Sequence, residues 1–202
     1  MPQDKLIMFD FDGVIADSLD DQSRAFVDTL RAHGLDDLAT PATFLEFTES
    51  NWFEALDGAG LPDAIVTEIE DAFAAVPSPD LFPEMAEVIE RLAAEHPVVV
   101  ITSSRTADVE AILDEHGVTG VTEVIGGDIE ASKTRKIRTA RRRYGESRQA
   151  WYVCDTVGDV HEARDAGAGT VGVAWGWHGE ERLLSAGPDL MARRPVELLD
   201  LF

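Results

Sequence analysis

The chain has 202 residues, and 45% of them are hydrophobic, which is enough for one full-sized core with a small inserted module. Thirty-nine acidic and seventeen basic side chains give a formal net charge of -22, which repels a nucleic acid backbone and an anionic membrane surface. The sequence also lacks an apolar run near the ~20 residues that span a bilayer, so we expect neither nucleic acid nor a membrane as a partner.

Short apolar runs rich in β-branched residues, each closed by a polar residue or glycine, predict buried strands. They lie at residues 5–9, 97–102, 121–126, 151–154 and 170–175. Amphipathic helical patterns, several of them ending at a glycine, fill residues 83–96, 106–117, 133–145 and 159–167. This alternation predicts an α/β, Rossmann-like fold with a mainly parallel sheet and helices on both faces.

Residues 16–80 interrupt the alternation. They carry helical patterns and no convincing strand, and the proline-rich segment "PSPDLFP" at 77–83 marks the return to the alternating pattern. We therefore predict two domains. Residues 1–15 and 81–202 form the Rossmann-like core, and residues 16–80 form a small inserted all-helical domain.

Polar side chains follow the predicted strands at their carboxyl ends. In open parallel sheets ligands bind at this edge, near the point where the strand order reverses. The residues expected to converge there are Asp10, Asp12, Thr102, Ser103, Lys133, Asp155 and Asp159. Several carboxylates in one crevice repel each other unless a cation neutralises them, and closely spaced hard oxygen ligands favour Mg²⁺.

These segments occur as an ordered set of motifs. The first is "DFDGVIADS", the second "VVVITSS", the third Lys133 in "ASKTRKI" and the fourth "YVCDTVGD", followed by "GVAWGWHGEERLLSAGPD". In these motifs the chain resembles the haloacid dehalogenase (HAD) superfamily, in its phosphatase branch with a helical cap inserted after the first motif. The resemblance covers nearly the whole chain.

The resemblance implies a role for each matching residue. Mg²⁺ would be held by the carboxylates of Asp10 and Asp155 and the backbone carbonyl of Asp12, with Asp159 in support. Asp10 would be the nucleophile and form an aspartyl-phosphate. Asp12 would protonate the leaving alkoxide and then take a proton from water. The phosphoryl oxygens would be bound by Thr102, Ser103 and Lys133.

Structural roles remain open for the same residues. Paired aspartates at a strand end are often turn formers or helix caps, and Thr102 with Ser103 could cap the helix that begins near residue 106. Asp159 could be a charge at a helix N-terminus, and Lys133 a solvated surface lysine.

Other residues near the motifs have alternative readings. Cys154 reads as a small apolar strand residue rather than a nucleophile, and His178 as structural. Trp52 and Phe53 could line the substrate or fill the core of the cap. The basic run "RTARRRYG" reads as a solvated helix face rather than an anion site.

Differences among HAD sub-families favour hydrolysis. Asp12 argues for phosphoryl chemistry rather than dehalogenation, and residues 16–80 lack the lysine that a Schiff-base hydrolase needs. The hexose-phosphate mutases carry a histidine where this chain has Gln22. The chain most resembles phosphoglycolate phosphatase-like proteins acting on a small phosphorylated metabolite. A mutase, a pyrophosphatase and a non-catalytic phospho-ligand-binding protein remain alternatives.

The compartment is inferred from what the sequence lacks. Cys154 is the single cysteine, so no internal disulfide can form, and the start "MPQDK" is unlike a signal peptide, which predicts a cytoplasmic protein. Only three lysines accompany the large acidic excess, a composition that resembles proteins of high-salt cytoplasms. We hold salt adaptation as a hypothesis, and both a monomer and a homodimer are compatible with the sequence.

Overall fold

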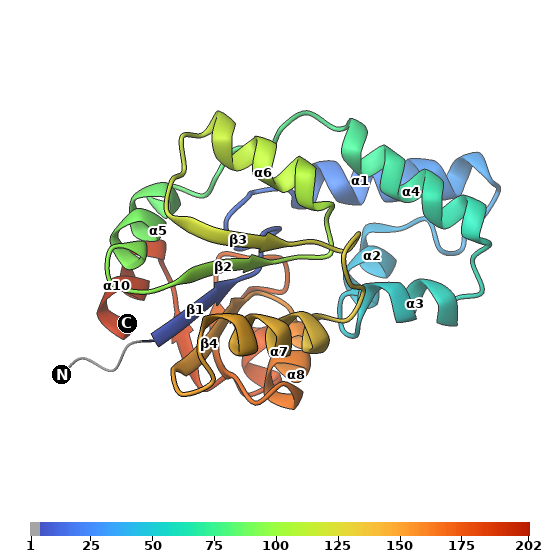
Figure 1. Cartoon of the computed structure of the whole chain (residues 1–202). Helices are drawn as coiled ribbons and strands as arrows, with labels where there is room; N and C mark the ends of the chain where they lie inside the picture. The colour runs from blue at the N-terminus through green and yellow to red at the C-terminus, as the bar shows by residue number, and fades with distance from the viewer. Residues whose placement is uncertain (1–4) are drawn as a thin grey trace.

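A computed structural model describes residues 5–202, and these form a six-stranded sheet in the order β3-β2-β1-β4-β5-β6 (Figure 1). All neighbouring strands pair in parallel. The strands are β1 (Lys5–Phe9), β2 (Val98–Ile101), β3 (Val121–Ile125), β4 (Gln149–Cys154), β5 (Gly169–Val173) and β6 (Leu190–Ala192). The predicted fold class is confirmed, and β6 is an edge strand that the sequence did not reveal.

Helices cover both faces of the sheet because the side chains of each strand alternate between them. On β1, Ile7 and Phe9 pack in the apolar cluster that includes α5 and α6, whereas Leu6 and Met8 pack in the cluster that includes α7 and α8. The helices of this part are α5 (Met85–Ala93), α6 (Thr106–Glu115), α7 (Lys133–Tyr144), α8 (Val157–Asp165), α9 (Gly179–Ser185) and α10 (Leu198–Leu201), with a 3-10 turn at Pro195–Glu197.

The segment between β1 and α5 is helical, and its helices lie beyond the ends of the strands toward which the arrows point in Figure 1. They are α1 (Leu19–Ala32), α2 (Pro41–Phe47), α3 (Trp52–Gly58) and α4 (Asp63–Ala75). Thr40 and Asn51 accept backbone N–H bonds with their side chains and so cap α2 and α3. These helices share an apolar cluster of their own. The division of the chain at residues 16 and 80 stays a prediction.

No helix in the described residues 5–202 combines the length and the apolar character needed to cross a bilayer.

Tyr152 joins two central strands through a buried hydrogen bond. Its hydroxyl is fully buried and donates to the backbone carbonyl of Ile101 at 3.0 Å. We expect Tyr152→Phe to lower the free energy of unfolding by about 1 kcal/mol, because a buried carbonyl loses a donor. Tyr144→Phe is the matched control, since that hydroxyl donates to Glu123 in a partly exposed position. Urea denaturation of both variants measures the effect, and equal losses would contradict the argument.

Candidate active site

The polar residues that follow β1, β2 and β4 meet at one edge of the sheet. Because β1 lies between β2 and β4, Asp10, Thr102 and Asp155 follow adjacent strands. The chain proceeds from β1 toward β3 on one side and from β4 toward β6 on the other, so the site lies at the switch point of the sheet. All three side chains are buried.

Asp10, Asp155 and Asp159 form a compact carboxylate cluster, which we call the acidic cluster. Each contributes an oxygen, and these oxygens all lie within 4.8 Å of one another. Lys133 Nζ donates to Asp10 Oδ2 and to Asp159 Oδ1, both at 2.7 Å. Burial lowers the pKa of Lys133, but the two carboxylates outweigh burial and raise it, so this lysine is a permanent ammonium. The structure thus brings together four of the residues that the sequence singled out.

Asp155 is held by the loop after β5. The backbone N–H of Trp177 donates to Asp155 Oδ2 at 2.7 Å. A Cβ at Gly13, in the loop after β1, would lie 2.0 Å from Asp155 Oδ2. A Cβ at Gly176, in the loop after β5, would lie 2.1 Å from Asp155 Cβ. Both positions therefore need glycine for the two loops to pack against Asp155. Burial, followed by the charge of Asp159, raises the pKa of Asp155 to about 8.

The acidic cluster fits a divalent cation. Within the described part of the chain, Asp155 Oδ1 and Asp159 Oδ2 are buried and have no hydrogen-bond partner. Unpaired carboxylate oxygens in a buried site are costly, and a hard cation with oxygen ligands removes that cost. The donor set of carboxylates without sulfur or imidazole suits Mg²⁺.

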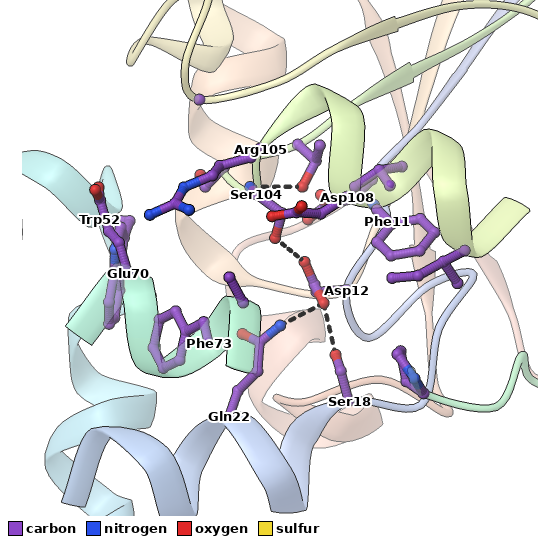
Figure 2. Close-up of a pocket in the computed structure, with 18 of the residues that line it drawn as sticks. Phe11, Asp12, Ser18, Gln22, Trp52, Glu70, Phe73, Ser104, Arg105 and Asp108 are labelled. Carbon is purple, nitrogen blue, oxygen red and sulfur yellow. Dashed lines mark hydrogen bonds between the residues drawn. The ribbon is translucent and has the colours of Figure 1, made fainter. Parts of the chain in front are cut away.

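The carboxylate of Asp12 is not part of the acidic cluster and has its own set of donors (Figure 2). Its Oδ1 accepts from the Ser18 hydroxyl at 2.7 Å and from the Gln22 amide at 2.6 Å, and its Oδ2 accepts from the Ser104 hydroxyl at 2.6 Å. Burial raises the pKa of Asp12, and the three hydrogen bonds oppose this rise. The carboxyl group can therefore hold a proton near the site and still be stabilised when ionised.

Thr102 and Ser103 line the same cavity as Asp10 and Asp12. The Thr102 hydroxyl oxygen accepts from the backbone N–H of Ser104 at 3.0 Å, which leaves the hydroxyl hydrogen available to a ligand. The capping alternative does not hold for these residues, because Arg105 precedes α6 and Asp128 accepts from the N–H of Thr106.

Asp159 lies in the first turn of α8, as its structural alternative requires, but its side chain also binds Lys133. Thr156 caps α8, and its hydroxyl oxygen accepts from the backbone N–H of Asp159. The Asp159 side chain is thereby free to face Lys133, which is 7% exposed and so is not a solvated surface lysine.

A cavity of about 540 Å³ extends from the acidic cluster to α1, α3 and α4. Trp52 and Phe53 both line it. Trp52 also packs against Phe26 and Phe44 in the apolar cluster of α1–α4, so for Trp52 both alternatives left open by the sequence apply.

Cys154 and His178 lie outside the cavity lining. Cys154 is fully buried in the cluster that includes α7 and α8, and burial raises the pKa of its thiol well above the usual value. His178 Nδ1 accepts from the backbone N–H of Val157 at 3.0 Å, and its Nε2 lies 2.8 Å from the Thr48 hydroxyl. The histidine thus connects α8 with the loop after α2.

We expect His178 to make the protein less stable in acid. Burial, with Arg182 adding to it, lowers the pKa of the folded imidazole below 6.5. As pH falls below 6.5 the unfolded chain takes up a proton first, so the free energy of unfolding decreases until the folded pKa is reached. Urea denaturation at pH 7.5 and 5.5 should show a smaller loss on acidification in His178→Gln than in the unsubstituted protein. An identical loss would rule out this contribution.

A profile described as haloacid dehalogenase-like hydrolase matches residues 7–173, which span β1 to β5 and every residue of the acidic cluster. The chain belongs to this hydrolase family. It is 28% identical over 207 residues to the phosphoglycolate phosphatase of Synechococcus elongatus, covering 96% of this chain and 94% of the relative. It is 25% identical to the phosphoglycolate phosphatase of Vibrio parahaemolyticus, covering 98% and 95%. The family match and these relatives support a phosphoric monoester hydrolase.

A solved structure has the same fold. The haloacid dehalogenase-like hydrolase from Streptococcus pneumoniae superposes with a TM-score of 0.80 over the full length of both chains, at 24% identity. This likeness concerns the fold, because the sequences have diverged too far for it to carry a substrate.

Proposed function

We propose that the protein is a Mg²⁺-dependent phosphatase that hydrolyses a small phosphomonoester through an aspartyl-phosphate on Asp10. One observation carries the proposal: Asp10 borders the cavity, contacts the Lys133 ammonium, and lies in a carboxylate cluster with unpaired buried oxygens. The three groups that the proposed reaction needs, a carboxylate to act as nucleophile, a cation and a set of oxygen donors for Mg²⁺, can therefore all be supplied at the end of β1.

The positions of the site residues suggest a separate role for each of them in the proposed reaction. Mg²⁺ would be held by the carboxylates of Asp10 and Asp155 and the backbone carbonyl of Asp12, with Asp159 in support. When bound, it would neutralise the carboxylates and the negative charge on the phosphoryl oxygens. Burial raises the pKa of Asp10, and Lys133 is the main group that opposes this rise, so Lys133 together with a bound cation would favour the ionised nucleophile.

Asp10 attacks phosphorus, a P–O bond to Asp10 forms, and the P–O bond to the leaving alcohol breaks. Asp12 donates its proton to the departing oxygen. It then accepts a proton from the water that attacks the phosphorus, and the P–O bond to Asp10 breaks. This releases inorganic phosphate and restores the Asp10 carboxylate and the protonated Asp12. Lys133, the Thr102 hydroxyl and the backbone near Ser103 offset charge on the transferred phosphoryl oxygens.

Phosphate release tests the proposal. The panel includes 2-phosphoglycolate, which the names of the relatives specify, together with hexose phosphates, pyrophosphate and a generic aryl phosphate. We expect release from at least one monoester with Mg²⁺ and none with EDTA. Release from pyrophosphate alone, or an isomerised hexose phosphate without release, would select the pyrophosphatase or mutase alternative. No turnover of any compound would overturn the proposal.

Mg²⁺ should stabilise the folded protein. A ligand at 100 times its Kd that binds the folded state alone adds about 2.7 kcal/mol to the free energy of unfolding. We expect a higher thermal midpoint with MgCl₂ and a much smaller shift in Asp155→Asn, which loses a predicted metal ligand. Because the net charge of -22 makes any salt stabilising by screening, KCl of equal ionic strength is the control. An equal shift with KCl would argue against a specific Mg²⁺ site.

A further inference from the structure

Aromatic side chains line the part of the cavity that α2, α3 and α4 form. They are Trp52 and Phe53 from α3, Phe73 from α4 and Phe44 from α2, and we call them the aromatic wall. Trp52 and Phe73 contact each other with ring centroids 5.8 Å apart. Figure 2 shows Trp52, Glu70 and Phe73 on one side, with Arg105 and Asp108 facing them from the core. A substrate bound with its phosphoryl group at Asp10 would direct its alcohol portion toward this wall.

Positive charge is scarce around the cavity. Lys133 and Arg105 are the basic side chains among the described residues that line it, and Lys133 is bound to the acidic cluster. Arg105 donates to Asp71 on α4 at 2.6 Å, in an exposed ion pair. The lining residues contributed by α1–α4 include the acids Asp21 and Glu70 and no basic residue.

Glu70 makes this part of the cavity unfavourable for a negatively charged ligand group. It lies next in the chain to Asp71, and burial is the largest influence that raises the pKa of its carboxyl group. Arg105 opposes that rise, so its charge is already shared between Asp71 and Glu70. A carboxylate on a bound ligand would have to compete with both acids for one arginine, and like charges placed together in a partly desolvated site repel strongly.

The volume of the cavity also favours a substrate larger than 2-phosphoglycolate. At about 540 Å³ it lies in the range of pockets that hold ligands of drug-like size. A compound as small as 2-phosphoglycolate would fill only a small part of this volume.

Resting on the proposed phosphatase function, we infer that the phosphomonoester recognised here carries an uncharged aromatic or similarly flat apolar group on its alcohol portion, and not a carboxylate. The aromatic wall binds this group by burying its surface, since aromatic faces stack and exclude water without any charge. Glu70, which lies beside this wall on α4, repels an anionic alcohol portion. The reaction itself is unchanged, and the leaving alcohol takes its proton from Asp12.

A matched pair of phosphonates tests the inference without turnover. Benzylphosphonate and phosphonoacetate share a non-hydrolysable C–P bond and differ in having a phenyl ring or a carboxylate. Calorimetric titration of the unsubstituted protein with Mg²⁺ should give at least roughly tenfold tighter binding of benzylphosphonate. Equal or tighter binding of phosphonoacetate, or no binding of benzylphosphonate, would overturn the inference.

Variants test separately whether the aromatic wall and Glu70 cause the preference for benzylphosphonate over phosphonoacetate. Phe53→Ala should weaken benzylphosphonate about tenfold, and Phe53 is suitable because it is not part of the apolar cluster of α1–α4. Glu70→Arg should tighten phosphonoacetate about tenfold by supplying a cation. Glu68→Arg is the control with the same charge change on the same helix, because Glu68 pairs with His33 and does not line the cavity. An equal change in phosphonoacetate affinity in Glu70→Arg and Glu68→Arg would show a general charge effect and contradict the inference.

Hydrolysis of benzyl phosphate and 2-phosphoglycolate completes the test. We expect a higher kcat/KM for benzyl phosphate. Hydrolysis of both with a preference for 2-phosphoglycolate would overturn the inference and leave the phosphatase intact. Hydrolysis of no phosphomonoester would overturn the proposed function, while the phosphonate titrations would still decide the inference.

Discussion

Replacing Asp10 by asparagine should lower kcat for any phosphomonoester substrate by about 10⁴-fold or more, because the amide oxygen cannot form the bond to phosphorus. The side chain keeps its size, so the folded structure should persist. Asparagine also removes one negative charge from the acidic cluster, where Asp155 and Asp159 lie close by, while Lys133 keeps its ion pair with Asp159. We therefore expect Asp10→Asn to be at least as stable as the unsubstituted protein when Mg²⁺ is absent.

Phosphate release and thermal unfolding, measured on the same preparation, separate these effects. Asp17→Asn is the control, since Asp17 belongs to the same motif but is exposed. Incubation with substrate followed by acid quenching and intact-mass measurement should detect a phosphoryl group on the unsubstituted protein and none on Asp10→Asn. A variant that retains activity within tenfold would exclude Asp10 as the nucleophile.

The core of the fold was predictable because its signals are local. β1, β2 and β4 are short apolar runs buried on both faces, and each ends at a polar residue that the topology brings to one edge. β6 gave no such signal. It has three residues, of which Leu190 and Met191 are only partly buried, and it exists as a strand because β5 offers it a pairing edge.

The acidic cluster was predictable for a similar reason, whereas its supporting contacts were not. Asp10, Lys133 and Asp155 follow from strand ends and motif order. Ser104 binds Asp12 across a separation of 92 positions, and its signal, a hydroxyl run after β2, does not say which hydroxyl faces the carboxyl group. The contact of Trp177 with Asp155 is made by a backbone N–H, which any residue except proline could supply, so only the three-dimensional structure reveals it.

The aromatic wall illustrates a different limit. Trp52 and Phe73 lie on helical patterns where an apolar residue reads equally well as core or as cavity lining. The choice depends on the position of α3 and α4 over the strand ends, which no local pattern encodes. Substrate selectivity is therefore the part of the function that the sequence predicted least.

Lys133→Met should damage both stability and catalysis. The substitution removes the ammonium that contacts Asp10 and Asp159 and leaves their buried carboxylates unpaired. Breaking a buried ion pair from one side costs about 3–5 kcal/mol of unfolding free energy. Loss of a group that stabilises charge on the phosphoryl oxygens should lower kcat by roughly 10²–10³-fold. Lys5→Met is the control, because Lys5 Nζ donates to the backbone carbonyls of Leu201 and Phe202 and not to a carboxylate of the acidic cluster.

The pH dependence of Lys133→Met distinguishes loss of an ion pair from loss of packing. Lys133 lowers the pKa of Asp159 and opposes the rise that burial causes in the pKa of Asp10, so removal of the ammonium should raise both folded values. A carboxyl group with a raised folded pKa binds its proton more tightly than in the unfolded chain, so stability falls as pH rises above the unfolded value toward the folded value. In EDTA, the deficit of Lys133→Met should therefore be larger at pH 8 than at pH 5, and Mg²⁺ should restore part of it. A deficit that is equal at both pH values and insensitive to Mg²⁺ would mean that the lysine acts through its packed methylene chain, and its role as the cation of the site would have to be abandoned.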